Sequence, residues 1–137
     1  MTPLKSGNGH DRHILVIDDD YEMCQLIKKF LQMENYHVQT ALSGYEGLFL
    51  LKQHSFDLVI SDLKMPGISG IELIRKARAV TPETPFILIT AFGDVKTYIE
   101  AMDSGVFEFL NKPIKMQDLK LIIHKALQDH CRECKIQ

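Results

Sequence analysis

The stretch RHILVIDDD, residues 12–20, decides the fold of this 137-residue chain. It opens with a short run of β-branched and apolar residues, which predicts a strand that is buried on both faces. Three consecutive aspartates end the run, and residues 21–35 then place apolar side chains at helical spacing. A buried strand that ends in acids and passes straight into an amphipathic helix predicts one βα unit.

The same unit recurs four more times along the chain. Further strands are predicted over residues 37–41, 56–62, 85–90 and 106–111, and further helices over residues 43–54, 69–80, 94–104 and 116–131. Strict alternation of strand and helix predicts an α/β fold in which helices cover both faces of a parallel sheet. We therefore predict a doubly wound, flavodoxin-like (βα)5 fold with the strand order 2-1-3-4-5.

Local signals mark several helix ends. Ser43-Gly-Tyr-Glu46 and Ser69-Gly-Ile-Glu72 are capping-box patterns, which predict helix starts. Gly93-Asp94 can cap the fourth helix, and Gly105 is a predicted helix stop.

Length and composition predict one soluble domain. The chain is 45% apolar and 25% charged with a net charge of −2, which is ordinary for a globular protein and gives no drive toward nucleic acid. No apolar run approaches the roughly 20 residues that span a bilayer, and the polar N-terminus does not resemble a secretory signal. Three cysteines make no disulfide framework, which favours the cytoplasm. We expect a loose tail over residues 1–12, the domain over residues 13–131, and a C-terminal tail over residues 132–137.

Polar side chains follow four of the five predicted strands. Asp18 and Asp19 follow the first strand, Asp62 ends the third, Thr90 ends the fourth, and Lys112 follows the fifth. In open parallel sheets, ligands bind beyond the carboxyl ends of the strands. Because the first and third strands are neighbours in the predicted order, the three aspartates should form one cluster. Lys112 starts about 10 Å from the third strand, a gap that a lysine stem largely covers.

The aspartate cluster predicts a cation site. Two carboxylates about 4 Å apart repel by about 4 kcal/mol at an effective dielectric of about 20, so either a proton is held or a cation binds. Oxygen ligands at an open site suit a hard cation, and Mg²⁺ fits best because it keeps several waters. A cation, a lysine and a hydroxyl around a carboxylate can support phosphoryl transfer, in which the carboxylate attacks in line.

Four segments carry a resemblance to a known family. ILVIDDD (14–20), VISDLKMPG (59–67), ILITAFGD (87–94) and FEFLNKPI (107–114) resemble, in this order and spacing, the signature segments of the response-regulator receiver domain of two-component signalling. The likeness extends from residue 13 to about residue 130. It looks most like receivers that precede an AAA+ ATPase or a DNA-binding output domain.

The resemblance implies a role for each strand-end residue. Asp62 matches the phosphoacceptor, Asp19 a direct Mg²⁺ ligand, and Asp18 an acid that acts on the metal largely through water. The backbone carbonyl of Lys64 matches a further metal ligand. The remaining positions match the switch hydroxyl (Thr90), the switch aromatic (Phe109) and the phosphate-binding lysine (Lys112). The Lys112–Pro113 peptide is expected to be cis.

The implied switch is a change of packing. A phosphoryl group adds charge and acceptor oxygens beside Thr90, and movement of Thr90 opens space for Phe109. The responding face would comprise the fourth helix, the fifth strand and the fifth helix. Val95 and Tyr98 lie on that helix and offer a partner surface, whereas Ile99 and Met102 are expected in the core.

Two positions are hypothesised to set the lifetime of the phosphoryl group. Lys64 and Phe92 lie two residues after Asp62 and Thr90, at positions that flank the path of the hydrolytic water in the family. A long cation and a bulky ring at these positions would obstruct that water, unless both point to solvent.

The implied partners are a sensor histidine kinase or a phosphotransfer protein, and an output domain or downstream protein. A homodimer through the responding face is possible, whereas contact of this domain with nucleic acid or membrane is not expected. The function is then a switch and not a turnover enzyme, with self-catalysed phosphorylation and slow autodephosphorylation only. Two alternatives stay open: a haloacid-dehalogenase-like phosphohydrolase that uses Asp18, and a receiver-like scaffold that is never phosphorylated. A flavodoxin-like cofactor module is disfavoured because acids stand where a phosphate loop should be.

Overall fold

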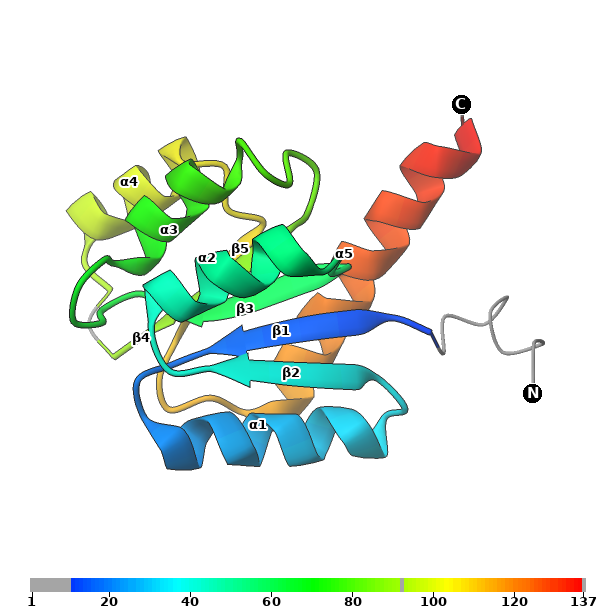
Figure 1. Cartoon of the computed structure of the whole chain (residues 1–137), viewed down its shortest axis with the longest axis horizontal. Helices are drawn as coiled ribbons and strands as arrows, with labels where there is room; N and C mark the ends of the chain where they lie inside the picture. The colour runs from blue at the N-terminus through cyan, green and yellow to red at the C-terminus, as the bar shows by residue number, and fades with distance from the viewer. Residues whose placement is uncertain (1–10, 92, 137) are drawn as a thin grey trace.

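The computed structural model of the chain describes residues 11–91 and 93–136, with side chains described through residue 128. Five parallel strands form one sheet in the order β2-β1-β3-β4-β5 (Figure 1). The strands are β1 (His13–Ile17), β2 (His37–Ala41), β3 (Leu58–Asp62), β4 (Phe86–Thr90) and β5 (Glu108–Asn111). The helices are α1 (Tyr21–Met33), α2 (Gly44–Gln53), α3 (Gly70–Ala77), α4 (Val95–Asp103) and α5 (Met116–Ile136). The predicted fold class and strand order are confirmed.

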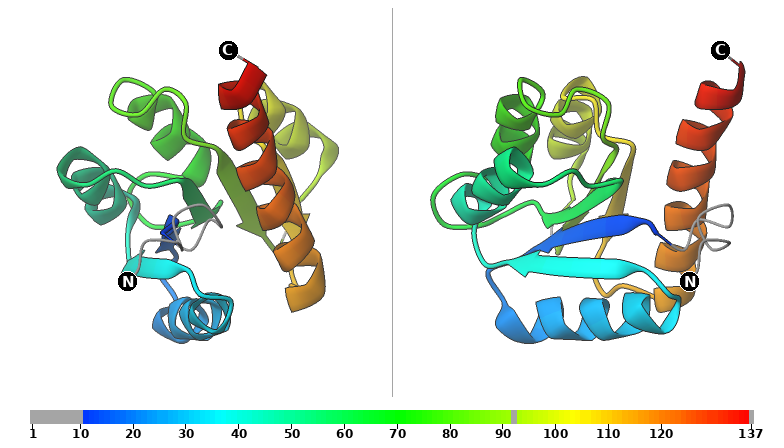
Figure 2. Two further views of the ribbon diagram at one scale, coloured as in Figure 1. Left: turned by 90° about the vertical axis from the view of Figure 1, so that its right-hand side faces the viewer. Right: turned by 45° about the vertical axis from the view of Figure 1, so that its right-hand side comes forward.

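Helices cover both faces of the sheet, as Figure 2 shows. One core cluster joins α1 and α5 to the sheet through residues such as Ile27 and Ile123. The second cluster joins α2, α3 and α4 to the opposite face through residues such as Leu51 and Ile74. All residues of β3 and β4 are buried, which explains why their sequences are continuous apolar runs instead of alternating ones.

The helix caps agree with the sequence patterns in all but one contact. Ser69 and Glu72 form the reciprocal capping box, and Asp94 accepts a hydrogen bond from the Thr97 backbone N–H at the start of α4. At α2, Ser43 accepts from the Glu46 N–H, but the Glu46 carboxylate accepts from the N–H of Leu42 instead of that of Ser43. That box is therefore only half formed.

Helix α3 is shorter than predicted, and Arg78 explains where it ends. The helix stops at Ala77, three residues before the predicted end. The Arg78 guanidinium donates to the backbone carbonyls of Pro82 (3.3 Å), Thr84 (2.8 Å) and Gly105 (2.9 Å). These bonds connect the α3–β4 loop to the turn that follows α4. Gly105 has a φ of +93°, which confirms it as the predicted stop of α4.

Two sequence expectations are wrong. Ile99 and Met102 are 57% and 43% exposed instead of belonging to the core, and Ala101 is the only residue of α4 that is buried. Helix α5 continues to Ile136 instead of ending near residue 131. No Gly or Pro stands between Met116 and Ile136 to stop the helix.

Other expectations lie outside the described part of the chain. The predicted N-terminal tail falls almost entirely there, and so does Phe92. Within the described residues, no helix is both long enough and apolar enough to cross a membrane.

Candidate functional site

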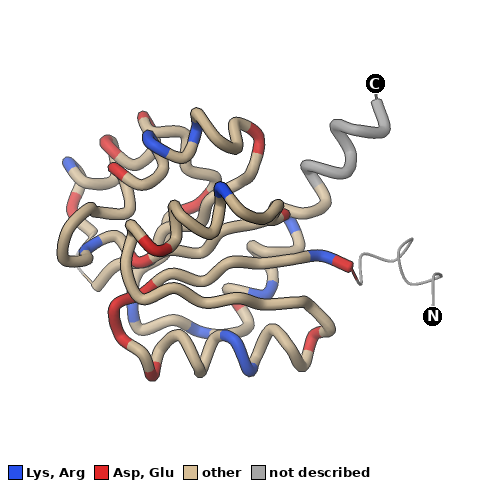
Figure 3. Tube along the Cα trace, viewed as in Figure 1, with Lys and Arg blue, Asp and Glu red and all other residues tan. Residues whose placement is uncertain are grey.

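The acidic site forms where β1 and β3 end side by side. Ile17 pairs with Ser61, so Asp18 and Asp62 follow at the same level of adjacent strands. Asp18, Asp19 and Asp62 each bring a carboxylate oxygen within 4.8 Å of the other two. Figure 3 shows acidic residues gathered where β1 passes into α1. The structure thus brings together the three aspartates that the sequence analysis grouped.

Two hydrogen bonds hold Asp18 in place, one to its side chain and one to its backbone. Asp18 is only 4% exposed, and its Oδ1 accepts a 2.9 Å hydrogen bond from the Asp20 N–H. The buried Cys24 thiol donates to the Asp18 carbonyl at 3.3 Å. Burial raises the pKa of Cys24 to about 11, which keeps the thiol protonated as a donor. Cys24 therefore supports the acidic loop in addition to packing.

Asp62 and Lys112 form the charged centre of the site. Asp62 is 8% exposed, and the Lys112 Nζ lies 3.7 Å from Asp62 Oδ1 and 3.7 Å from Asp18 Oδ2. Burial, followed by the negative charge of Asp18, raises the pKa of Asp62 to about 6, although Lys112 opposes the shift. Burial likewise raises the pKa of Asp18. Lys112 thus spans the predicted gap between strands.

The raised pKa of Asp62 gives a stability prediction. The folded state holds a proton on Asp62 between about pH 4 and pH 6, where the unfolded chain has already lost it. Stability from this group is therefore lost as the pH rises through that window. At neutral pH without Mg²⁺, Asp62→Asn should raise the free energy of unfolding by about 1–3 kcal/mol.

Urea denaturation at neutral pH and at about pH 4 measures this difference. The stabilisation should vanish at the lower pH, where both forms of residue 62 are neutral. Added Mg²⁺ should stabilise the wild type more than the variant. An Asp62→Asn protein that is less stable than wild type at neutral pH would contradict the prediction that burial of the ionised Asp62 carboxylate destabilises the fold.

Thr90 and Lys112 are held by neighbouring strands. Thr90 ends β4, is 1% exposed, and its backbone carbonyl accepts a 2.7 Å hydrogen bond from the Lys112 N–H. This bond continues the pairing of Thr90 with Asn111 and aims the chain after β5 back toward the site. The Lys112–Pro113 peptide is cis, as predicted.

Phe109 lies against the loop that joins β4 to α4. It is half-buried, packs against the core on the α2–α4 face, and meets the Tyr98 ring edge-on with centroids 5.8 Å apart. A Cβ on Gly93 would come within 2.9 Å of the Phe109 ring and 2.5 Å of Asn111 Oδ1. A larger residue at position 93 would therefore force the side chains of Phe109 and Asn111 to shift.

Gly70 is a residue beside the site whose importance the sequence patterns did not reveal. A Cβ at this first residue of α3 would lie 2.6 Å from the Asp62 carbonyl and 2.7 Å from the Leu88 side chain. The Gly70 N–H donates to the Leu63 carbonyl at 2.7 Å, so α3 starts directly against the end of β3. The available signal was a glycine inside a helical pattern, which usually has a packing reason.

The donor set fits a hard divalent cation. Three carboxylates and one ammonium leave two negative charges, which a dication balances. All the acidic ligands are oxygens, and Asp19 is exposed, which leaves room for the waters that Mg²⁺ retains. The arrangement joins a buried carboxylate, a cluster of oxygens that could hold a cation, and a lysine, and phosphoryl transfer uses groups of these kinds.

Comparison with known proteins gives a consistent result. The family model described as the response regulator receiver domain matches residues 14–124. The chain is 36% identical over 120 residues to the transcriptional regulatory protein ZraR of Salmonella typhimurium, and 40% identical over 116 residues to the transcriptional regulatory protein GlrR of Escherichia coli. These matches cover 88% and 85% of the chain, but only 27% and 26% of the relatives. The chain thus spans about a quarter of the length of these curated relatives.

A solved structure shares the fold closely. The beryllofluoride-activated NtrC4 receiver domain dimer superimposes with a TM-score of 0.82 at 30% identity, covering 86% of this chain and 98% of that one. The likeness therefore extends over most of this chain and nearly all of the NtrC4 receiver domain.

Proposed function

The chain belongs to the response regulator receiver family, and from this premise we propose that Asp62 accepts a phosphoryl group from a histidine kinase or a phosphotransfer protein. The observation that carries the proposal is the buried Asp62 carboxylate, which lies beside two further carboxylates and 3.7 Å from the Lys112 ammonium. Phosphoryl transfer uses both kinds of group that surround Asp62, acids that can hold a cation and a lysine.

The Asp62 side chain acts as the nucleophile. Its pKa of about 6 leaves it ionised at neutral pH. An Asp62 oxygen attacks the phosphorus of a phosphohistidine, an O–P bond forms, and the P–N bond breaks with its electron pair returning to the imidazole. The product is an aspartyl phosphate, and the electron pair of the broken P–N bond becomes the lone pair of the imidazole nitrogen. Lys112 neutralises phosphoryl oxygens through this step.

The acidic residues hold Mg²⁺ in this proposal. Asp19, Asp62 and the backbone carbonyl of Lys64 would hold the ion directly, and Asp18 would act on it through water. The ion would supply positive charge to the phosphoryl oxygens. The carboxylate oxygens within 4.8 Å of one another support this assignment.

The switch runs from Thr90 to the α4–β5–α5 face. The Thr90 hydroxyl donates to a phosphoryl oxygen, and Phe109 moves further into the core as Thr90 shifts. Because Phe109 already contacts Tyr98 on α4, its movement changes the surface of that helix. Loss of the phosphoryl group by hydrolysis resets the switch.

Helix α4 provides the surface that partner proteins bind. Its exposed apolar side chains form a patch with no covering element among the described residues; the four are Val95, Tyr98, Ile99 and Met102. We expect an output domain or downstream protein to bind it, or a second copy of the chain, as the NtrC4 receiver forms a dimer. The proposed setting is the cytoplasm, where histidine kinases present their phosphoryl groups.

The test of this function is intact-mass spectrometry after incubation with acetyl phosphate, with and without Mg²⁺. One phosphoryl adduct should form, and only with Mg²⁺. Borohydride reduction followed by peptide mapping should place it on Asp62. An adduct on Asp18 would support a phosphohydrolase instead, and no adduct under any condition would leave a protein-binding scaffold.

The lifetime of the aspartyl phosphate depends on Lys64 in this proposal. Lys64 is exposed two residues after Asp62, and its charge helps to lower the pKa of Asp94 at the start of α4, after the hydrogen bonds from Thr97. Its long side chain should hinder the approach of water, so Lys64→Asn should speed autodephosphorylation several-fold. Decay of the adduct, followed by mass spectrometry, measures the effect. Lys115→Asn is the control, and an unchanged decay rate in Lys64→Asn would refute the role.

A further inference from the structure

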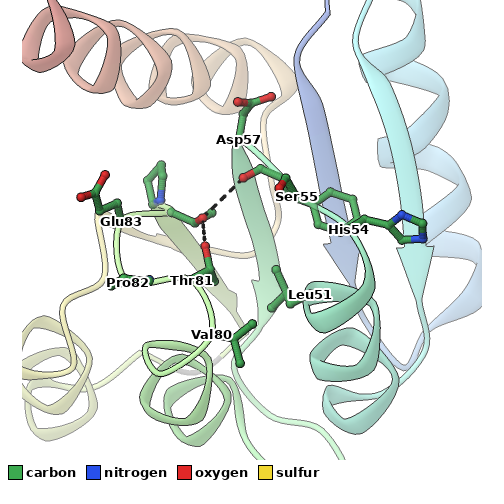
Figure 4. A pocket seen from close by; sticks show the side chains of 11 residues that line it. Leu51, His54, Ser55, Asp57, Val80, Thr81, Pro82 and Glu83 are labelled. Carbon is green, nitrogen blue, oxygen red and sulfur yellow. Dashed lines mark hydrogen bonds between the residues drawn. The ribbon is translucent and has the colours of Figure 1, made fainter.

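A hollow of about 590 Å³ lies at the amino-terminal edge of the sheet, opposite the acidic site. Three of the six histidines of the chain line it: His13 at the start of β1, His37 at the start of β2, and His54 just after α2. In Figure 4, His54 extends from the end of α2 toward the side on which β1 and β2 lie. The proposed phosphorylation cycle uses none of these side chains.

His13 and His37 are brought together by the strand register. They are paired residues of adjacent parallel strands, and their rings stack with centroids 4.7 Å apart and planes inclined by 18°. The N–H of His13 donates to Asp57 Oδ2 at 2.8 Å, which fixes the start of β1 against the chain entering β3. Two imidazoles are therefore held side by side on fixed backbone.

An acidic side chain completes the group. Asp11 Oδ1 lies 3.8 Å from His37 Nε2, and both side chains are more than half exposed. This distance is too long for a good hydrogen bond, so the carboxylate is free to turn. Two imidazoles thus line a hollow that admits water, and one carboxylate lies beside the second of them.

We propose that this edge binds a first-row transition-metal dication, with His13, His37 and Asp11 as protein ligands and water completing the shell. Imidazole nitrogen suits Zn²⁺, Ni²⁺ and Cu²⁺, whereas Mg²⁺ takes oxygen ligands, so the chain separates the two classes of cation between opposite edges of one sheet.

Binding requires the ring stack to open. The lone pair of an imidazole nitrogen lies in the ring plane, so two stacked rings cannot aim at one ion. Both rings are exposed, and rotation about their side-chain bonds turns the nitrogens toward a common point. The bound ion then joins the first residues of β1 and β2 at the edge of the sheet.

The test is an NMR titration of the full chain, without a polyhistidine tag, with Zn²⁺ in excess Mg²⁺. Excess Mg²⁺ occupies the aspartate cluster, and Cys131→Ser with Cys134→Ser in every protein removes the two C-terminal thiols. The ring-nitrogen signals of His13 and His37 should shift on addition of one equivalent. His13→Gln and His37→Gln should each weaken binding at least about tenfold. His54→Gln should have a smaller effect.

His124→Gln is the matched control, because His124 is an exposed histidine on α5 away from the hollow. It should leave Zn²⁺ binding unchanged. The proposal is overturned if the signals of His13 and His37 do not move, or if the affinity survives in the His13→Gln/His37→Gln double variant. Because both results are independent of acetyl phosphate, they are separate from the test of phosphorylation.

Discussion

Asp62→Asn is expected to carry no phosphoryl adduct after incubation with acetyl phosphate and Mg²⁺. The amide of asparagine has nearly the shape of the carboxylate but lacks its charge and nucleophilicity, so the attacking atom is removed while the surrounding packing is kept. Asp62 is the last residue of the buried strand β3, and its carboxylate lies 3.7 Å from the Lys112 ammonium. The result is measured as the fraction of phosphorylated protein by intact mass.

The control separates loss of the nucleophile from loss of the fold. Asp57→Asn makes the same chemical change at the opposite edge of the sheet, just before β3, and should be phosphorylated like wild type. Asp62→Asn itself should be at least as stable as wild type at neutral pH, because it removes a buried charge. A full-sized adduct on Asp62→Asn would show that another carboxylate accepts the phosphoryl group.

Asp18 is the carboxylate that would most readily replace Asp62, but its geometry disfavours that role. It is 4% exposed, and the Asp20 N–H already binds its Oδ1. Lys112 approaches its other oxygen at 3.7 Å, so neither oxygen is directed freely toward solvent. A weak adduct on Asp18 in the variant would therefore require the acidic loop to rearrange.

The site could be predicted from the sequence because parallel strands bring their ends together. Once the apolar runs are recognised as strands, the aspartates after β1 and β3 must be neighbours in the order 2-1-3-4-5. The reach of Lys112 follows from strand spacing and lysine length. No side-chain packing had to be known for this step, only the order of the strands.

The surroundings of the site could not be predicted in the same way. Apolar spacing on α4 does not show how much of the helix the sheet covers, and contact through the small Ala101 leaves Ile99 and Met102 exposed. The contact of Gly93 with Phe109 depends on loop geometry that no local pattern encodes. The sequence therefore predicts which groups meet at strand ends, but not which side chains a neighbouring helix covers.

Lys112→Met should slow the phosphorylation of Asp62 by about 10²–10³-fold. Its ammonium is the one cation within 4.0 Å of Asp18 or Asp62 among the described residues, and preorganised charges of this kind contribute about that much to a transition state. Methionine keeps much of the stem that packs beside the site. Rates of adduct formation from acetyl phosphate, measured by mass spectrometry at saturating Mg²⁺, report the change.

Two readouts distinguish lost charge from lost structure. Lys112 lowers the pKa of Asp62, so its removal should raise that pKa above about 6, and the variant should regain part of its rate as the pH rises. Lys115→Met, which changes an exposed lysine three residues later, should leave both the rate and the pH profile unchanged. If Lys112→Met reacted at the wild-type rate, the ion pairs at 3.7 Å would serve only to hold the fold, and phosphoryl oxygens would be neutralised by Mg²⁺ alone.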